Sequence, residues 1–140
     1  MLDGDKLVRL LRPIANTKYP LKLTMIDLSN NKIEVNEHSA NIISAILDKT
    51  VEENGKTIKL QGNTIMYPKF FSTVISNFEL TELSLYDCKI SPDALIDLSD
   101  VLAMNRRIRK LDLSYNPEAF AKKDAIAQFG MGVSVNEHLE

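Results

Sequence analysis

One apolar pattern occurs four times along this 140-residue chain and constrains its fold more than any other feature of the sequence. The clearest copy runs from Leu80 to Ile90, with Leu or Ile at its first, fourth, sixth and eleventh positions. The ninth position of this copy is Cys88, and the other copies place Asn31, Asn63 and Asn116 there. Consecutive copies are therefore roughly 25 to 32 residues apart, which is typical of stacked structural repeats.

Each copy predicts a short strand followed by a helix. Apolar and polar residues alternate at the fourth to sixth positions, which indicates a strand with one buried face. After Ile90, Ser91 is suited to cap a helix and Pro92 to begin it. Leu95, Leu98 and Leu102 would form the apolar stripe of that helix. The other expected helices contain Ile42, Ile43, Ile46 and Leu47; Phe70, Phe71, Val74 and Ile75, after Pro68; and Ala125, Ile126, Phe129 and Val133.

Repeated strand and helix units predict an α/β fold, a right-handed solenoid with parallel β-strands on the concave face and α-helices on the convex face. We expect residues 21–140 to form about four units. An Asn stands three residues before the first apolar position in three cases, Asn77, Asn105 and Asn136. By this marker Leu139 opens a fifth unit that the chain does not complete, so we expect the chain to belong to a longer array.

Residues 1–20 do not fit the repeat. Leu7, Leu10 and Leu11 have the spacing of an amphipathic helix, and Pro13 and Pro20 follow them. Such a helix would either cover the edge of the first repeat or continue an upstream repeat.

The pattern Leu-x-x-Leu-x-Leu-x-x-(Asn/Cys)-x-Ile resembles the ribonuclease-inhibitor-like class of leucine-rich repeats across roughly residues 21 to 140. The resemblance implies a solenoid that serves as a protein-binding scaffold. Repeats of this class occur in enzyme inhibitors, GTPase activators, actin-regulatory and ciliary proteins and innate immune sensors. The resemblance therefore implies a partner protein without identifying it.

The chain departs from the repeat pattern at three places. Gly55 stands where the second unit should begin with an apolar residue, and residues 51–54 are expected to be a surface insertion. In the fourth unit, Pro117 and Glu118 interrupt the pattern after Asn116. We expect an irregular turn there, with Phe120 as the substitute buried side chain.

The ninth-position residues predict a structural ladder formed by Asn31, Asn63, Cys88 and Asn116. An amide side chain both donates and accepts hydrogen bonds, so it can satisfy backbone groups where a strand bends out of its sheet. We expect Cys88 to be buried in this ladder, as a structural thiol rather than a nucleophile or redox sensor.

The side chains that alternate with the buried ones define a candidate binding surface on the concave face. They fall into three columns across the units: Met25, Thr57, Glu82 and Lys110; Asp27, Lys59, Ser84 and Asp112; and Ser29, Gln61, Tyr86 and Ser114. Tyr86 is the expected binding anchor, because a large ring with few rotatable bonds often contributes strongly to an interface. The alternative is that its ring only packs on neighbouring side chains.

Composition excludes several function classes. The 17 basic and 19 acidic residues give a net charge of −2, and 44% of residues are hydrophobic, which argues against disorder and against a dedicated nucleic-acid binder. A single cysteine and the lack of a secretory signal favour a cytoplasmic protein. No apolar run approaches the roughly 20 residues of a membrane span. No phosphate loop or nucleophile–base motif is present, so we expect neither an enzyme nor a cofactor.

Two further patterns have competing interpretations. Arg106, Arg107, Arg109 and Lys110 could bind an anionic ligand, or they could form a solvated loop that leads into a strand. The tetrapeptide Val-Asn-Glu-His contains both histidines, His38 and His138, at different phases of the repeat, so we expect coincidence rather than a metal site.

The function that these observations favour most is non-enzymatic binding of another protein by the concave strands. The alternative is an architectural segment of a larger assembly, for example cytoskeletal or ciliary, that contacts its neighbours through its helices and ends. A further alternative is regulatory binding of anionic ligands by the cluster at residues 106–110.

Overall fold

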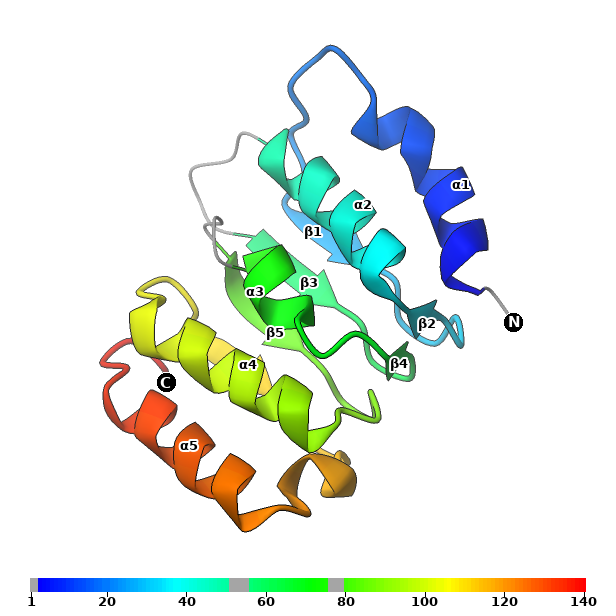
Figure 1. Ribbon diagram of the computed structural model, residues 1–140. Helices are drawn as coiled ribbons and strands as arrows, with labels where there is room; N and C mark the ends of the chain where they lie inside the picture. Colours follow the sequence, from blue (N-terminus) through cyan, green and yellow to red (C-terminus); the bar gives the residue numbers. More distant parts are fainter. Residues whose placement is uncertain (1–2, 51–55, 76–79) are drawn as a thin grey trace.

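The computed structural model describes residues 3–50, 56–75 and 80–140, which form a mixed α/β fold with a parallel sheet (Figure 1). The strands are β1 (Met25–Asp27), β2 (Glu34–Val35), β3 (Lys56–Lys59), β4 (Thr64–Ile65), β5 (Leu80–Ser84) and β6 (Lys110–Asp112). The helices are α1 (Gly4–Ala15), α2 (Glu37–Asp48), α3 (Phe70–Ile75), α4 (Pro92–Met104) and α5 (Lys123–Ser134), with a short 3₁₀ helix, η1 (Pro117–Phe120).

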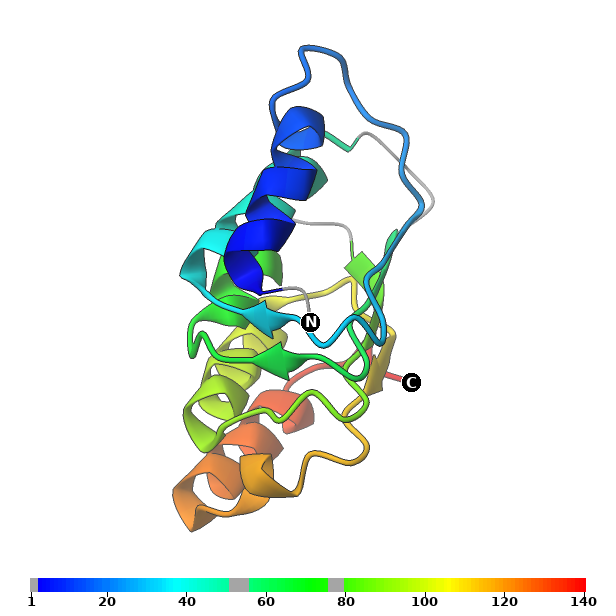
Figure 2. The same ribbon diagram turned by 90° about the vertical axis from the view of Figure 1, so that its right-hand side faces the viewer.

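The main-sheet strands form one layer and the helices form a second. Within each layer, the elements lie side by side in chain order. The main sheet has the order β1-β3-β5-β6, and every neighbouring pair is parallel. The two short strands β2 and β4 form a second parallel pair. The helices lie together on one side of the main sheet (Figure 2). The predicted parallel strands backed by helices are therefore confirmed.

The apolar positions of the repeat form the core between the two layers. Ile58 and Leu83 of the central strands are buried in it, as is Leu85, which directly follows β5. Phe70 and Phe71 of α3 are also buried, with their rings edge to face at a centroid distance of 5.2 Å. Leu95, Leu98 and Leu102 of α4 are buried as well, as their spacing predicts.

Local capping signals fix where two helices begin. The Ser91 hydroxyl accepts a hydrogen bond from the Ala94 N–H at 3.2 Å, and Pro92 is the first residue of α4, as predicted. Asn36 caps α2 through a reciprocal arrangement with Ser39, in which each side chain accepts from the other's backbone N–H. This second cap was not predicted from the sequence.

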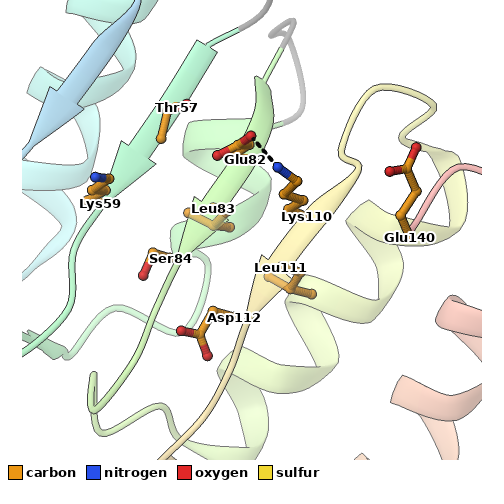
Figure 3. Close-up of a pocket in the computed structure, with 9 residues that line it drawn as sticks. All are labelled: Thr57, Lys59, Glu82, Leu83, Ser84, Lys110, Leu111, Asp112 and Glu140. Atoms are coloured by element: carbon orange, nitrogen blue, oxygen red, sulfur yellow. Dashed lines mark hydrogen bonds and ion pairs between the residues drawn. The ribbon is translucent and has the colours of Figure 1, made fainter.

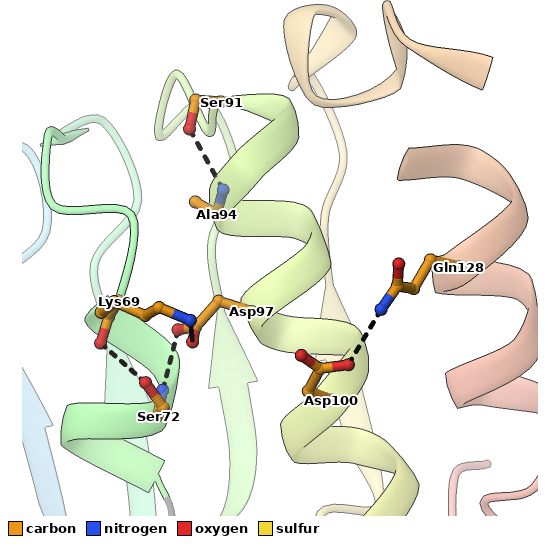
Figure 4. Close-up of polar contacts among 7 residues, drawn as sticks. All are labelled: Lys69, Ser72, Ser91, Ala94, Asp97, Asp100 and Gln128. Carbon is orange, nitrogen blue, oxygen red and sulfur yellow. Dashed lines mark hydrogen bonds and ion pairs between the residues drawn. The ribbon is translucent and has the colours of Figure 1, made fainter. Parts of the chain in front are cut away.

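Helix α4 is joined to both neighbouring helices by polar contacts (Figure 4). The carboxylate of Asp97, which is buried, accepts a hydrogen bond from the Ser72 N–H of α3 at 2.9 Å. On the side of α5, Asp100 accepts from the Gln128 amide at 3.1 Å, and the Ser99 hydroxyl donates to the Gln128 carbonyl. These bonds hold three successive helices in one layer.

Three apolar positions that the sequence pattern placed on buried faces are exposed: Leu10, Phe120 and Ile126, which is 46% exposed on α5, the last helix of the layer. Leu10 is 64% exposed, whereas Leu7 on the same helix is buried, because α1 packs on the rest of the fold mainly along its face next to α2. Phe120 is 37% exposed, and Ala119 takes the buried place instead. The reason is the 3₁₀ helix η1: with three residues per turn, the inward position after Asn116 is Ala119.

The other sequence predictions at irregular positions concern residues 51–54, Gly55 and Asn77. These residues lie outside the described ranges.

Candidate functional site

Strand register brings the predicted columns together on the side of the sheet that faces away from the helices. In the first column, Thr57 pairs with both Met25 and Glu82, and Glu82 pairs with Lys110. The second column is formed in the same way by Asp27, Lys59, Ser84 and Asp112. We call these eight residues, together with Gln61 and Tyr86, the strand face.

Backbone hydrogen bonds extend the pairing beyond the strands to the third column. The Gly62 N–H donates to the Tyr86 carbonyl at 3.0 Å, and the Asp87 N–H donates to the Ser114 carbonyl at 3.0 Å. Gln61 and Ser114 therefore flank Tyr86 on its two sides. The third column follows the register of the first two.

Charges of both signs lie close together on the strand face. A depression of about 330 Å³ is lined by Thr57, Lys59, Glu82, Leu83, Ser84, Lys110, Leu111, Asp112 and Glu140 (Figure 3). Lys110 Nζ and a Glu82 carboxylate oxygen form an ion pair at 3.1 Å across β5 and β6. Hydrogen bonds from Ser29 hold the pKa of Asp27 below its ordinary value, and the Lys59 charge acts in the same direction.

Two of the three ninth-position asparagines, Asn63 and Asn116, bond to backbone groups of the preceding unit, whereas Asn31 does not. Asn63 is buried, and its amide accepts from the Ile33 N–H at 2.9 Å and donates to the Leu28 carbonyl at 2.8 Å. Asn116 joins the fourth unit to the third in the same way, because its amide donates to the Leu85 carbonyl at 2.7 Å. Asn31 is exposed, and its amide donates to carbonyls of its own loop.

Cys88 occupies the same place in the third unit without an amide. Its side chain is fully buried, and the Asn116 amide oxygen accepts from the backbone N–H of Cys88 at 3.0 Å. The Cys88 thiol donates to the Leu60 carbonyl at 3.1 Å. Burial raises the pKa of Cys88 from 9.0 to about 12. The thiol is therefore protonated near neutral pH, which argues against nucleophilic chemistry.

The eighth position of every unit has a left-handed backbone conformation, which was not predicted from the sequence. The φ angles are 59° at Asn30, 70° at Gly62, 48° at Asp87 and 59° at Tyr115. Asn, Gly and Asp adopt this conformation more readily than other residues. Their recurrence at the eighth position was a signal from which the turn could have been predicted. Tyr115 does not fit that signal.

Tyr115 contacts Tyr86, the predicted anchor. The ring centroids are 4.8 Å apart with the ring planes at 47°, and the two side chains are 39% (Tyr86) and 72% (Tyr115) exposed. Tyr86 thus packs on a neighbouring ring and is still partly exposed to solvent, and its role as a binding anchor stays a prediction. Tyr115 was not predicted as a site residue, because it lies outside the three alternating columns.

The basic cluster is partly neutralised by carboxylates. Lys110 is paired with Glu82, and Arg109 lies 3.8 Å from a carboxylate oxygen of Glu140. Arg106 is exposed in the turn before β6. The cluster lies in an exposed loop that leads into β6, and Arg109 and Lys110 already have anionic partners.

The two histidines occupy unrelated environments. His38 lies in the first turn of α2, beside Arg9 and Arg12 of α1. His138 follows Asn136, whose amide oxygen accepts the His138 N–H at 2.9 Å near the other end of the chain. Across the described ranges, no group of three or more His, Cys, Asp or Glu side chains is arranged to hold a metal ion.

Comparisons with known protein families, with curated proteins and with solved structures find no match to this chain. Among the described residues, no helix combines the length and apolar character that crossing a bilayer requires.

Proposed function

We propose that the chain is a leucine-rich-repeat solenoid of the ribonuclease-inhibitor-like class and that it binds another protein through the strand face. The observation that carries this proposal is the register of β1, β3, β5 and β6, which gathers polar and charged side chains from four units into one surface. Repeat proteins use such extended surfaces to bind their partners.

The side chains of the strand face suit recognition of a protein. The Glu82–Lys110 ion pair is largely solvent-exposed, so it contributes little to stability and is available to a partner. Tyr86 adds a half-exposed aromatic ring at one end of this surface. Tyrosine is among the residue types that are enriched in protein interfaces and that contribute most to their binding energy.

Combined substitution of Tyr86, Glu82 and Lys110 by Ala tests the proposal. We expect the triple variant to fold normally and to lose most of the partner captured by the wild-type chain from its native source. The matched control is the double variant Asp93→Ala/Lys122→Ala, which removes an exposed ion pair of 3.6 Å on the helix side. Equal capture by the triple variant and the wild type would count against the proposal.

An architectural role is the second candidate, and exposed apolar side chains on the outermost helices favour it. Leu10 and Ile14 are exposed on α1, and Ile126 and Met131 are exposed on α5. In this role the helices rather than the strands would contact neighbouring molecules. It would be supported if variants of the helix side, and none of the strand face, abolished capture.

Regulatory binding of an anionic ligand by residues 106–110 is less well supported, because Arg109 and Lys110 already contact carboxylates. It predicts binding that weakens steeply as salt concentration rises. Titration with inorganic phosphate and with vesicles containing acidic lipid would reveal such binding.

A further inference from the structure

Tyr115 has a backbone conformation that is unfavourable for a tyrosine. The eighth position has positive φ in all four units, and the other three units place Asn, Gly or Asp there. A bulky aromatic side chain is unfavourable in this conformation, and such residues concentrate at functional sites. Lys32 and Lys89, at the tenth position, also have positive φ, but neither carries a ring. The Tyr115 side chain is 72% exposed, so burial in the core does not account for it.

The contact with Tyr86 gives the Tyr115 ring a defined place. Tyr86 and Tyr115 follow neighbouring strands, β5 and β6, and the loops that carry them are joined by two hydrogen bonds. The Leu85 N–H donates to the Asp112 carbonyl at 2.8 Å, and the Asp87 N–H donates to the Ser114 carbonyl at 3.0 Å. Two rings with centroids 4.8 Å apart therefore form one aromatic surface at the end of the strand face.

Two carboxylates flank this aromatic surface. Asp87 directly follows Tyr86, and Asp112 pairs in register with Ser84, two residues before Tyr86. Partial desolvation, the neighbouring Tyr115 hydroxyl and both carboxylates raise the pKa of Tyr86 above its ordinary value of 10.0. The two carboxylates make the electrostatic surroundings of the ring negative.

We propose that Tyr86, Tyr115, Asp87 and Asp112 form a binding site for an arginine side chain of the partner protein. A guanidinium group stacks on aromatic faces and forms hydrogen bonds with carboxylates at the same time, which matches both components of this surface. The inference rests on the proposed function and specifies the chemistry of the partner at one end of the strand face.

Nuclear magnetic resonance of the tyrosine ring signals tests this site directly. The probes are N-acetyl-arginine amide and N-acetyl-citrulline amide, which have nearly the same shape but differ in charge. We expect the Tyr86 and Tyr115 ring signals to respond about three- to fivefold more strongly to the arginine probe at equal concentration. Equal responses to both probes, or no response of these rings to the arginine probe, would overturn the inference.

Two variants test separately the contributions of the carboxylates and of the Tyr115 ring to arginine binding. Both are chosen to keep the backbone conformation of the turns that carry these residues. Asp87→Asn/Asp112→Asn introduces residues that tolerate the backbone, and an amide oxygen in place of the Asp112 carboxylate can still accept the Ser114 N–H, which the carboxylate accepts at 2.9 Å. We expect this variant to respond equally to the two probes. Tyr115→Asn places a residue suited to positive φ at the eighth position, and we expect it to fold and to lose the response of Tyr86 to arginine.

Capture of the partner protein by these variants shows separately whether the arginine site and the proposed function are correct. Both are supported if capture is lost with Glu82→Ala/Lys110→Ala and also with Tyr115→Asn. If only the Glu82/Lys110 variant loses capture, the proposed function stands and the arginine site is wrong. If neither variant loses capture, both are wrong.

Discussion

Asn116 and Cys88 occupy equivalent positions but satisfy the backbone around them in different ways. The Asn116 amide bonds to several backbone groups, including the N–H groups of Cys88 and Ile90 and the Leu85 carbonyl. The Cys88 thiol makes weaker contacts with two carbonyls. At this position of the repeat, the side-chain hydrogen bonds between the third and fourth units therefore come from the one amide of Asn116.

Removing the Asn116 amide should lower the stability of the fold. Asn116→Ala leaves buried donors and acceptors without partners, so we expect it to lower the free energy of unfolding by about 3 kcal/mol. Asn31→Ala is the matched control, because the Asn31 side chain is exposed and bonds only within its own loop. We expect it to cost less than about 1 kcal/mol. Urea denaturation measures both values, and equal losses would contradict the assigned role of Asn116.

Because the pKa of Cys88 is raised in the folded state, the free energy of unfolding should fall as pH rises above 9. Between the ordinary pKa of 9.0 and the folded-state value of about 12, the unfolded chain binds fewer protons at this thiol than the folded chain. The contribution of Cys88 to stability is therefore fully present below pH 9 and is lost as pH rises toward 12. We expect wild type to lose more stability than Cys88→Ala over this range, as measured by urea denaturation at several pH values. Parallel pH profiles of the two proteins would contradict this account.

At the scale of single elements, α4 and α5 approach closely at Gly132. A Cβ atom on this residue would lie 2.5 Å from the carbonyl oxygen of Ser99 on α4. A Cβ on Gly130, two residues earlier in α5, would meet nothing within 4 Å. The close packing of the two helices therefore requires glycine at position 132 but not at position 130.

The two glycines predict opposite effects of the same substitution. We expect Gly132→Ala to destabilise the fold by about 1–3 kcal/mol, because α5 must move away from α4. Gly130→Ala should instead stabilise it by about 0.5–1 kcal/mol through helix propensity. Chemical denaturation of both variants checks this pair. A stabilising effect at both positions would mean that the helices are farther apart than described.

The elements differ in how well they could be predicted from sequence. Ser91 and Pro92 define the start of α4 locally, so that boundary was predictable. Phe120 was predicted as buried because the repeat pattern was extended through a segment that forms a 3₁₀ helix. Leu10 was predicted from helical spacing alone, which does not show how wide the contact with the neighbouring helix is.

The columns of the strand face were predictable because strand register follows the repeat register. The pairing of Glu82 with Lys110 is a direct consequence of it. The Tyr86–Tyr115 contact was missed, because it depends on the backbone angle of Tyr115 as well as on strand alternation.

At the scale of the whole molecule, one side is covered by the helix layer and the other is the exposed side of the sheet. The helices pack against one another and against the sheet, with α4 between α3 and α5. The opposite side of the sheet, away from the helices in Figure 2, carries the strand face. The contacting rings of Tyr86 and Tyr115 follow β5 and β6 at its end. Under the proposed function, a partner lies along the strands and leaves the helix layer unchanged.

Site-specific photo-crosslinking tests this central claim most directly. A benzophenone amino acid is placed at Lys59, on the strand face, or at Asp93, on the helix side, and the chain is irradiated in its native source. We expect a covalent adduct with the partner from position 59 and little or none from position 93. An adduct from position 93 with none from position 59 would contradict the strand face as the binding surface.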